Sequence, residues 1–458
     1  MSNSATLSAR ERIERLVDAN SFVEIGGMVT KRNTDFNMQE KAVPADGVIT
    51  GYGIVDSDLV YVYSQDVTAM NGSIGEMHAK KIASLYDMAV RAGAPVIGLI
   101  DCAGVRVQEA VDALAGFGEI YMAKIRAAGV IPQISAILGS CGGGVAISSR
   151  LSDITLMDAG KGHLFVNSPN AIDGNRVEKL DTSAAAFQAE SGNVDIVCQG
   201  EEEVMAKIRQ LIGILPANAA ASAETEPGDD LNRMLTGFDG YAADAQKALT
   251  QIADDMTFIE LKAEYGKEMV VGLMKLAGVT VGAIANSAEA VLSTNGCKKA
   301  EQFMYFCDSF EIPVITLTNV KGYASDLKEE KTIAQAVADM TYAFANADVP
   351  KINLITGDAY GSAYVAMNSK HIGADLVMAL EKANVGVMDS AAAAKILCED
   401  EIKGAEDAKK ALEERKKEFD ALQAGADAAA RRGYVDNMIE GDSVRKHLIY
   451  ALQMFGMR

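Results

Sequence analysis

Short motifs from the first half of the chain recur in the second half at one fixed offset of 218 residues, with no gap across the block. The recurring pairs are Lys80-Lys81 with Lys298-Lys299, residues 94–97 with 312–315, residues 131–134 with 349–352, and the glycine-rich turn 139–144 with 357–362. Four matches in one register are not expected by chance, so the chain is predicted to be two copies of one domain. Because each copy carries the same loops, the duplication favours two related sites, one for each of two reactants.

Apolar strands alternate with helices in each copy. In the first copy, a helix at about residues 75–92 precedes an apolar strand at 96–100, and a second helix precedes the apolar strand at 133–138. Continuous apolar strands that alternate with helices predict a parallel sheet covered on both faces, and therefore an α/β fold. Ahead of these elements, residues 47–55 and 59–64 are predicted to form a hairpin, which the second copy repeats.

Composition along the chain suggests the domain limits. We expect the first domain at residues 1–217 and the second at 241–458, with a linker at 218–240. The linker is placed where the chain changes from alanine-rich to acidic with proline and glycine, at 218–230. Near the end of the chain, residues 402–430 are dense in Ala, Glu and Lys at helical spacing, which predicts one long exposed helix.

The composition also disfavours several classes of protein. A formal net charge of −20 argues against binding to nucleic acid or to an anionic membrane surface, because both would repel the chain. No apolar run approaches the roughly 18 residues that a membrane helix needs, and no signal peptide opens the chain, so we expect a cytoplasmic protein without direct membrane insertion. The six cysteines never form a CxxC and the four histidines have no metal-ligand spacing, so reduced thiols and no metal site are predicted.

Two loops of the first copy follow buried strands. Residues 101–106 come directly after the strand at 96–100, and residues 139–144 come directly after the strand at 133–138 and lead into a helix. Ligands of parallel sheets bind at the carboxyl ends of the strands. Consecutive glycines leave backbone N–H groups unshielded, and two such groups, one per loop, can form an oxyanion hole. The alternative is a tight packing turn in which glycine only provides room.

The second copy keeps the glycines of both loops, since Gly104 falls on Gly322 and Gly143 falls on Gly361. The chain contains no GxSxG nucleophile motif and no phosphate-binding P-loop. Candidate acid–base groups are Asp46, Asp66 and Asp101. Carboxylates at such positions are more often turn or cap residues. A site made of N–H donors without an obvious base suits a reaction through an enolate, in which stabilising charge is the main task.

Longer stretches of the chain are similar to a known family. They include PADGVITG at 44–51, GSIGEMHAKK at 72–81, and residues 9–15, 21–24, 61–66, 92–98, 129–135, 358–364, 367–375, 432–436 and 445–452. At these residues the chain resembles the carboxyltransferase subunits of biotin-dependent acyl-CoA carboxylases and decarboxylases. That group includes the propionyl-CoA carboxylase β subunit and the methylmalonyl-CoA decarboxylase α subunit. The likeness covers nearly the whole chain.

The resemblance implies a tandem duplication of a crotonase-like (ClpP/crotonase) α/β domain, with a site between the first half of one subunit and the second half of another. It also implies a homo-oligomer, commonly a hexamer. In the family, one oxyanion hole polarises an acyl-CoA thioester and the other polarises the ureido carbonyl of biotin. Biotin arrives on a separate carrier protein, and its nitrogen serves as the base, so no metal and no catalytic side chain is implied.

The resemblance also assigns roles to individual residues. Gly143 and Gly144 match one oxyanion pair, and Ser362 and Ala363 match the other. The loop expected to line the acyl-CoA site contains Ala103, Gly104, Val105 and Arg106. The residues matched to the biotin side or to acyl preference are Gly322, Tyr323, Tyr360, Gly361 and Val365.

The second half departs from the family pattern at its candidate site. Lys321 and Tyr323 stand in a turn that the family writes Pro-Gly-Phe, and Asp358 stands where the family has a basic residue. Ser362 replaces the second glycine of the family motif, and Val365 replaces a frequent aspartate that influences acyl preference. A serine keeps its backbone N–H, so the hole can survive, whereas the altered side chains bear on the acyl substrate and on biotin use.

The sequence therefore predicts a carboxyltransferase subunit that moves a carboxyl group between biotin on a carrier protein and a short acyl-CoA of the malonyl or methylmalonyl type. Its expected partners are a biotin carboxyl carrier protein and either a biotin carboxylase or the membrane subunits of a decarboxylase. If it binds the membrane subunits of a decarboxylase, the cytoplasmic chain would lie at the membrane surface through those partners. Two alternatives stay open: a biotin-independent crotonase-type acyl-CoA enzyme, and a non-catalytic assembly subunit of a decarboxylase complex.

Overall fold

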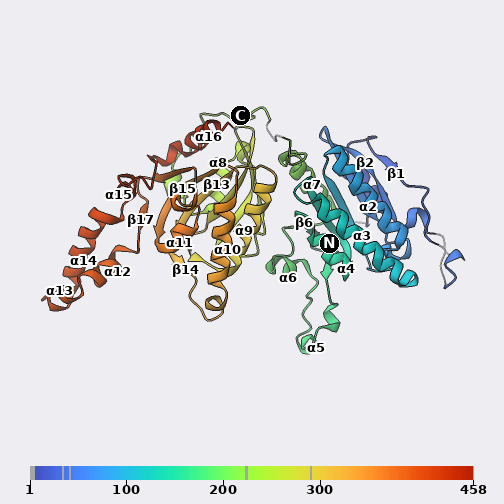
Figure 1. Cartoon of the computed structure of the whole chain (residues 1–458), viewed down its shortest axis with the longest axis horizontal. Helices are drawn as coiled ribbons and strands as arrows, with labels where there is room; N and C mark the ends of the chain where they lie inside the picture. Colours follow the sequence, from blue (N-terminus) through green and yellow to red (C-terminus); the bar gives the residue numbers. More distant parts are fainter. Residues whose placement is uncertain (1–5, 33–35, 41–42, 222–224, 289–290, 457–458) are drawn as a thin grey trace. The chain divides into compact units, whose positions relative to one another are not determined.

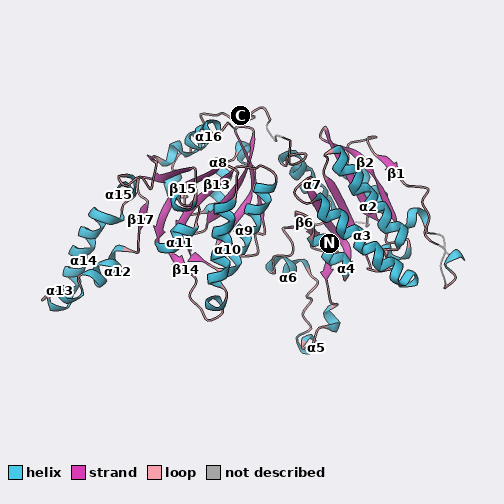
Figure 2. Cartoon of the chain, viewed as in Figure 1, coloured by secondary structure: helices cyan, strands magenta, loops and turns pink. Residues whose placement is uncertain are grey.

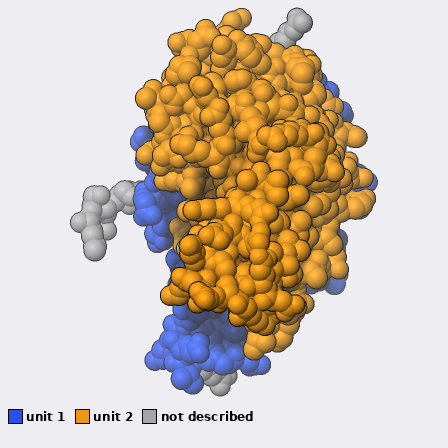
Figure 3. Space-filling view, turned by 90° about the vertical axis from the view of Figure 1, so that its left-hand side faces the viewer, with its two compact units in different colours: residues 1–223 blue, residues 224–458 orange. Residues whose placement is uncertain are grey.

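The computed structural model describes residues 6–32, 36–40, 43–221, 225–288 and 291–456. The chain forms two compact units, residues 1–223 and 224–458, which are coloured separately in Figure 3. The division lies inside the stretch expected to be a linker, while the domain limits of 1–217 and 241–458 stay a prediction. Each unit is built of helices around one large sheet (Figure 2).

The sheet of the first unit has the strand order β1-β2-β3-β4-β5-β6-β8, and β7 pairs with β5 (Figure 1). Its strands are β1 (Val23–Ile25), β2 (Val48–Val55), β3 (Asp58–Gln65), β4 (Val96–Cys102), β5 (Gln133–Gly142), β6 (Ile154–Asp158), β7 (His163–Phe165) and β8 (Ile196–Cys198). Strands β1 to β3 are antiparallel and include the predicted hairpin, and the strands from β3 to β8 run parallel. Because β4 is buried along its whole length, residues 96–100 are continuously apolar rather than alternating, and only Asp101 near its end is charged.

Helices pack on both faces of this sheet. The helices of this unit are α1 (Ala9–Leu16), α2 (Glu76–Ala92), α3 (Ala110–Ala127), α4 (Gly144–Arg150), α5 (Asn175–Glu178), α6 (Ala185–Glu190) and α7 (Glu201–Ile214), of which the short α5 projects away from the sheet (Figure 1). On one face, α2 and α3 share a core with Val96 and Ile100 of β4. Ile97 and Leu99 alternate with these residues and therefore point to the opposite face, where they are equally buried. Helices α1 and α7 cover that face.

The second unit repeats this architecture with the strand order β9-β10-β11-β13-β15-β16-β18, and β17 pairs with β15. The strands are β9 (Phe258–Leu261), β10 (Met269–Leu276), β11 (Val279–Asn286), β13 (Val314–Val320), β15 (Lys351–Tyr360), β16 (Leu376–Leu380), β17 (Asn384–Gly386) and β18 (Asn437–Ile439), with β12 (Val291–Leu292) and β14 (Gly322–Tyr323) as a separate pair. Its helices include α8 (Ala245–Ile252), α9 (Thr294–Ser309), α10 (Ile333–Asn346), α11 (Gly361–Ala366), α12 (Ser390–Leu397) and α16 (Val444–Met454).

The register of the two sheets follows the repeat in the sequence. Cys102 pairs with Cys141 across β4 and β5, and Val320 pairs with Ala359 across β13 and β15, which are the positions 218 residues later. The same strand order and the same cross-strand pairing confirm the predicted duplication of one α/β domain.

The long helix predicted at residues 402–430 is wrong. The segment forms α13 (Glu399–Gly404), α14 (Ala408–Phe419), a π-helical turn (Asp420–Ala424) and α15 (Ala426–Ala430). The Asp407 side chain accepts hydrogen bonds from the N–H groups of Lys409 and Lys410, so it caps a new helix at this point. Gly425 has an extended backbone that separates the last two elements. Composition at helical spacing did not reveal these two breaks.

Candidate functional site

The first unit brings its two candidate loops to one edge of the sheet. Because Cys102 of β4 pairs with Cys141 of β5, the loop that begins at Ala103 and the turn at Gly143 leave neighbouring strands at the same end. This is the carboxyl edge at which parallel sheets bind ligands. The structure therefore places the two predicted loops of the first copy next to each other.

The backbone N–H groups of these loops differ in whether they have a hydrogen-bond acceptor. Gly143 has a left-handed backbone, with φ of +60°, and its N–H donates to the carbonyl oxygen of Phe165 at 2.9 Å. Among the described residues, the N–H groups of Gly144 and Val105 have no acceptor. One unpaired donor therefore lies in each loop, which is the composition of an oxyanion hole.

Arg106 lies beneath this loop rather than on its outer side. The guanidinium is almost fully buried, and it contacts Asp46, donates to Glu109 Oε1 at 2.8 Å and donates to the carbonyl oxygen of Ser73 at 2.8 Å. Burial raises the pKa of Asp46, and the Arg106 charge opposes this shift. Arg106 was expected among the residues that line an acyl-CoA site, and the contacts point instead to a role in holding the loop.

The second unit has the equivalent edge at β13 and β15. A cavity of about 620 Å³ lies there, and the residues that line it are Lys321, Gly322, Tyr323, Asp358, Tyr360, Gly361, Ser362, Ala363, Val387, Met388, Asp389 and Ala392. The N–H groups of Ser362 and Ala363 have no acceptor within the described part of the chain. The structure thus collects the predicted residues of the second copy, except Val365, around one cavity.

Side-chain contacts join residues that line this cavity, which is smaller than a second cavity in the same unit. Tyr323 Oη donates a hydrogen bond to Ser362 Oγ at 2.8 Å, and Lys321 Nζ lies 3.5 Å from a carboxylate oxygen of Asp358. The other carboxylate oxygen of Asp358 accepts from Asn384 Nδ2 at 2.9 Å. Burial and the Asp358 charge raise the pKa of Tyr360, so the tyrosine keeps its proton at neutral pH.

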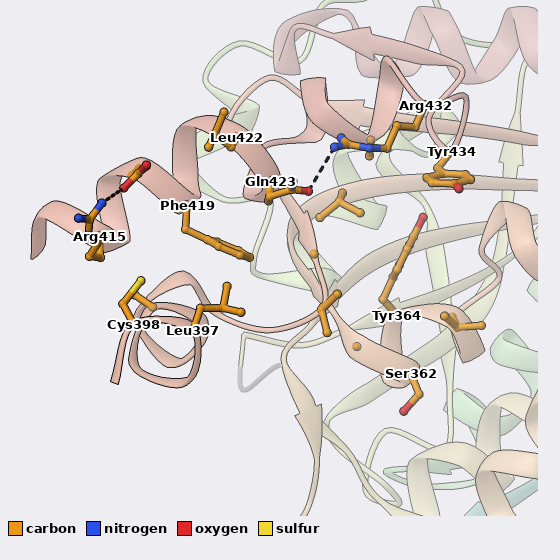
Figure 4. A pocket seen from close by; sticks show the side chains of 18 of the residues that line it. Ser362, Tyr364, Leu397, Cys398, Arg415, Phe419, Leu422, Gln423, Arg432 and Tyr434 are labelled. Carbon is orange, nitrogen blue, oxygen red and sulfur yellow. Dashed lines mark hydrogen bonds and ion pairs between the residues drawn. The ribbon is translucent and has the colours of Figure 1, made fainter. Parts of the chain in front are cut away.

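A larger and more apolar cavity of about 960 Å³ adjoins the same turn (Figure 4). Its walls come from α11, α12, α14 and the segment around α15, and they include Tyr364, Val365, Leu397, Phe419, Leu422 and Tyr434. Val365 therefore lies here rather than in the smaller cavity. No sequence pattern predicts this cavity, because its residues are spread over 361–434 and face one another only after the helices break at Asp407 and Gly425.

The cysteines, histidines and carboxylates of the described residues form no cluster of three or more that could bind a metal ion. Nor does any helix among the described residues have the length and apolar character needed to cross a membrane. The six cysteines are free, and all except the half-buried Cys398 are buried.

Tandem α/β units that each present backbone donors at a sheet edge are suited to enzymes that stabilise a polarised carbonyl or an enolate. A family model described as the carboxyl transferase domain matches residues 3–456. The chain belongs to the carboxyl transferase family. This match confirms the predicted family and the carboxyltransferase class, while the roles of individual residues stay predictions.

Several named proteins are similar to this chain. The methylmalonyl-CoA decarboxylase subunit alpha of Propionigenium modestum is 38% identical over 467 residues, covering 98% of this chain and 90% of the relative. The propionyl-CoA carboxylase beta chain of Roseobacter denitrificans is 36% identical over 461 residues, covering 97% and 90%. The solved structure of transcarboxylase 12S, a hexamer with methylmalonyl-coenzyme A and methylmalonic acid bound, is 33% identical and superposes with a TM-score of 0.92, covering 99% of this chain and 90% of that one.

Proposed function

We propose that this chain is the carboxyltransferase component that moves a carboxyl group between biotin on a carrier protein and a short acyl-CoA of the malonyl or methylmalonyl type. The observation that carries the proposal is the repeated edge: each unit presents unpaired backbone N–H donors where two parallel strands end side by side. The names of the relatives supply the substrate class, because they act on propionyl-CoA or methylmalonyl-CoA.

In the first unit, the N–H groups of Val105 and Gly144 would hold the thioester oxygen of the acyl-CoA. Negative charge grows on this oxygen as an enolate forms, and fixed donors stabilise that charge without having to reorganise. The buried contacts of Arg106 with Asp46 and Glu109 hold the loop that carries Val105. The role of the first unit is therefore to bind the acyl group, orient it and stabilise its charge.

The second unit offers a site of suitable size for biotin. The smaller cavity of about 620 Å³ has room for a small bicyclic ring, and Ser362 and Ala363 would present their N–H groups to its carbonyl oxygen. When bound, biotin supplies the nitrogen that carries or receives the carboxyl group. The protein groups around it bind and orient the ring and do not themselves take up the carboxyl group.

Assembly and location belong to the same proposal. Transcarboxylase 12S is solved as a hexamer, which supports a hexamer of this chain as well. We propose a biotin carboxyl carrier protein as its partner in the cytoplasm, together with a biotin carboxylase or with the membrane subunits of a decarboxylase.

The test incubates the purified chain with malonyl-CoA or methylmalonyl-CoA, in the presence and absence of free biotin. Turnover is measured as carbon dioxide release and as formation of the CoA products. Release that requires biotin is the expected result, and the preferred thioester then identifies the acyl group. Release at the same rate without biotin would contradict the proposal and favour a biotin-independent crotonase-type reaction. A chain that is inactive with free biotin and also with an added biotinyl carrier would favour an assembly role.

A further inference from the structure

The two copies of the candidate site differ in their side-chain hydroxyl groups. Val105 in the first unit corresponds to Tyr323 in the second, and Gly144 corresponds to Ser362, each at the offset of 218 residues. The first copy therefore has no side-chain hydroxyl at either position, and the second copy has one at both. This difference arises between two halves of one chain that otherwise share strand order and register.

The two hydroxyl groups of the second copy form a hydrogen bond in which one is the donor and the other is the acceptor. Tyr323 Oη donates to Ser362 Oγ at 2.8 Å. A serine hydroxyl that accepts a hydrogen bond still has its own proton to donate. Acceptance of one hydrogen bond polarises the O–H group and strengthens its next donation. Ser362 is exposed and has room to make that donation to a bound molecule.

Ser362 lines both cavities, and its hydroxyl meets that of Tyr323 in the smaller one. Figure 4 shows the Ser362 side chain pointing away from the rings of Tyr364 and Phe419, which line the larger apolar cavity. Tyr323 lines only the smaller of these two cavities, and the unpaired N–H groups of Ser362 and Ala363 lie beside it. Backbone and side-chain donors are therefore combined in one small space.

The charges around this cavity favour an uncharged ligand. Lys321 is the cation of the lining, and its ammonium lies beside the Asp358 carboxylate at 3.5 Å. Asp389 adds a second carboxylate, which caps α12 by accepting from the N–H of Ala392 at 2.8 Å. A carboxylate or phosphate ligand would meet no surplus positive charge here, whereas a neutral carbonyl would meet several hydrogen-bond donors.

We propose that Tyr323 and Ser362 act as a coupled pair of positioning residues in which the Ser362 hydroxyl donates to the carbonyl oxygen of a cyclic urea, the ring of biotin. This inference rests on the proposed function and assigns to the second site two side chains that the first site lacks. The acyl-CoA thioester of the first site is held by backbone donors, and the urea of the second is held by backbone and hydroxyl donors together.

The test measures binding of free biotin to the full chain by saturation-transfer NMR titration, for the wild type, Tyr323→Phe, Ser362→Gly and the double variant. Each single variant is expected to weaken biotin binding by about tenfold, the value of one hydrogen bond of about 1.4 kcal/mol. Because the two hydroxyl groups act in series, the double variant is expected to bind no more weakly than the worse single variant. Tyr450→Phe is the matched control, since Tyr450 is an exposed tyrosine on α16, and it should bind biotin as the wild type does.

Kinetics provide a second readout. In Tyr323→Phe the KM for biotin should rise by about tenfold while the KM for methylmalonyl-CoA stays unchanged. Wild-type affinity for biotin in both single variants, or additive losses in the double variant, would overturn the coupled pair and leave the proposed function intact. A wild-type chain that neither binds biotin nor depends on it for turnover would overturn the proposed function and this inference together.

Discussion

Gly144 has two roles, one in packing and one as a backbone hydrogen-bond donor at the candidate site. Its N–H is unpaired among the described residues, its carbonyl oxygen accepts from Tyr121 Oη at 2.7 Å, and a Cβ added to it would lie 3.0 Å from atoms of Phe117 and Tyr121. Glycine is thus needed for room as well as for exposure of the donor.

Gly144→Ala is expected to lower kcat by about 100-fold or more, because the new methyl group displaces the turn and misdirects the N–H donor. Steady-state carboxyl transfer measures this loss, and circular dichroism shows whether the fold is kept. Gly213→Ala is the matched control on α7, since nothing lies within 4 Å of its Cβ position, and it should keep full activity. Normal turnover by Gly144→Ala would remove this N–H from the mechanism.

His78 gives a residue-scale prediction about pH. The ring is fully buried, with Nδ1 2.9 Å from the carbonyl oxygen of Asp46 and Nε2 3.2 Å from Gln65 Nε2. Burial, with the charges of Arg106 and Lys81, lowers the pKa of His78 to about 3. Because the unfolded chain binds this proton with a pKa of about 6.5, the contribution of His78 to stability is complete above that pH and is lost as the pH falls towards 3.

The expected measurement is the free energy of unfolding in urea at a series of pH values from 7 to 4. His78 should contribute a slope that approaches about 1.4 kcal/mol per pH unit within this interval. His78→Gln removes the titrating group, so its unfolding free energy should fall less steeply with decreasing pH than that of the wild type. Parallel slopes for the two proteins would mean that His78 does not carry the effect.

At the scale of elements, the repeated Lys-Lys motif ties a helix to the segment that leads into the β-hairpin in both units. The second lysine is buried each time: Lys81 donates to the carbonyl oxygens of Ala45 and Val48, and Lys299 donates to those of Lys262 and Tyr265 at 2.8 and 3.0 Å. The first lysine of each pair, Lys80 or Lys298, is exposed. The motif is therefore repeated for a structural reason.

Lys299→Met is expected to lower the free energy of unfolding by about 2–3 kcal/mol, because two buried carbonyl groups lose their donor. Lys298→Met changes the exposed neighbour in the same way and should stay within about 0.5 kcal/mol of the wild type. Urea unfolding of the three proteins measures the difference. Equal stability of the two variants would show that the buried ammonium contributes nothing net.

Much of the fold was predictable because local signals and topology agreed. Continuous apolar runs at 96–100 and 133–138 became the buried strands β4 and β5, and the duplication predicted from the repeat offset recurs in the pairing of β13 with β15. For the candidate site, the sequence predicted which residues take part but not which of them contact one another. Tyr323 and Ser362 were each identified, yet their hydrogen bond depends on two loops that are 39 residues apart in the chain. Arg106 was placed in a ligand-facing loop because sequence does not show which side of a loop is buried.

For the whole molecule, the apolar surface of α3 bears on assembly. Val111, Leu114 and Met122 recur at helical spacing on α3 and are 73%, 61% and 50% exposed. Large exposed apolar residues on one side of a helix are costly in water unless another surface covers them. The hexamer proposed for this chain supplies such a surface, and the strong negative charge of −20 per chain makes apolar contact a more suitable source of association than charge attraction.

Sedimentation velocity is expected to give the mass of six chains of 48.5 kDa for the wild type. Val111→Asp with Leu114→Asp should shift this mass to smaller species at the same protein concentration, because burial of two carboxylates opposes the contact. Gln210→Asp adds a charge at an exposed polar position on α7, and it should leave the hexamer intact. If the double variant sediments as the wild type does, the outer face of α3 does not hold the subunits together. A wild type that sediments as a single chain would refute the hexamer itself.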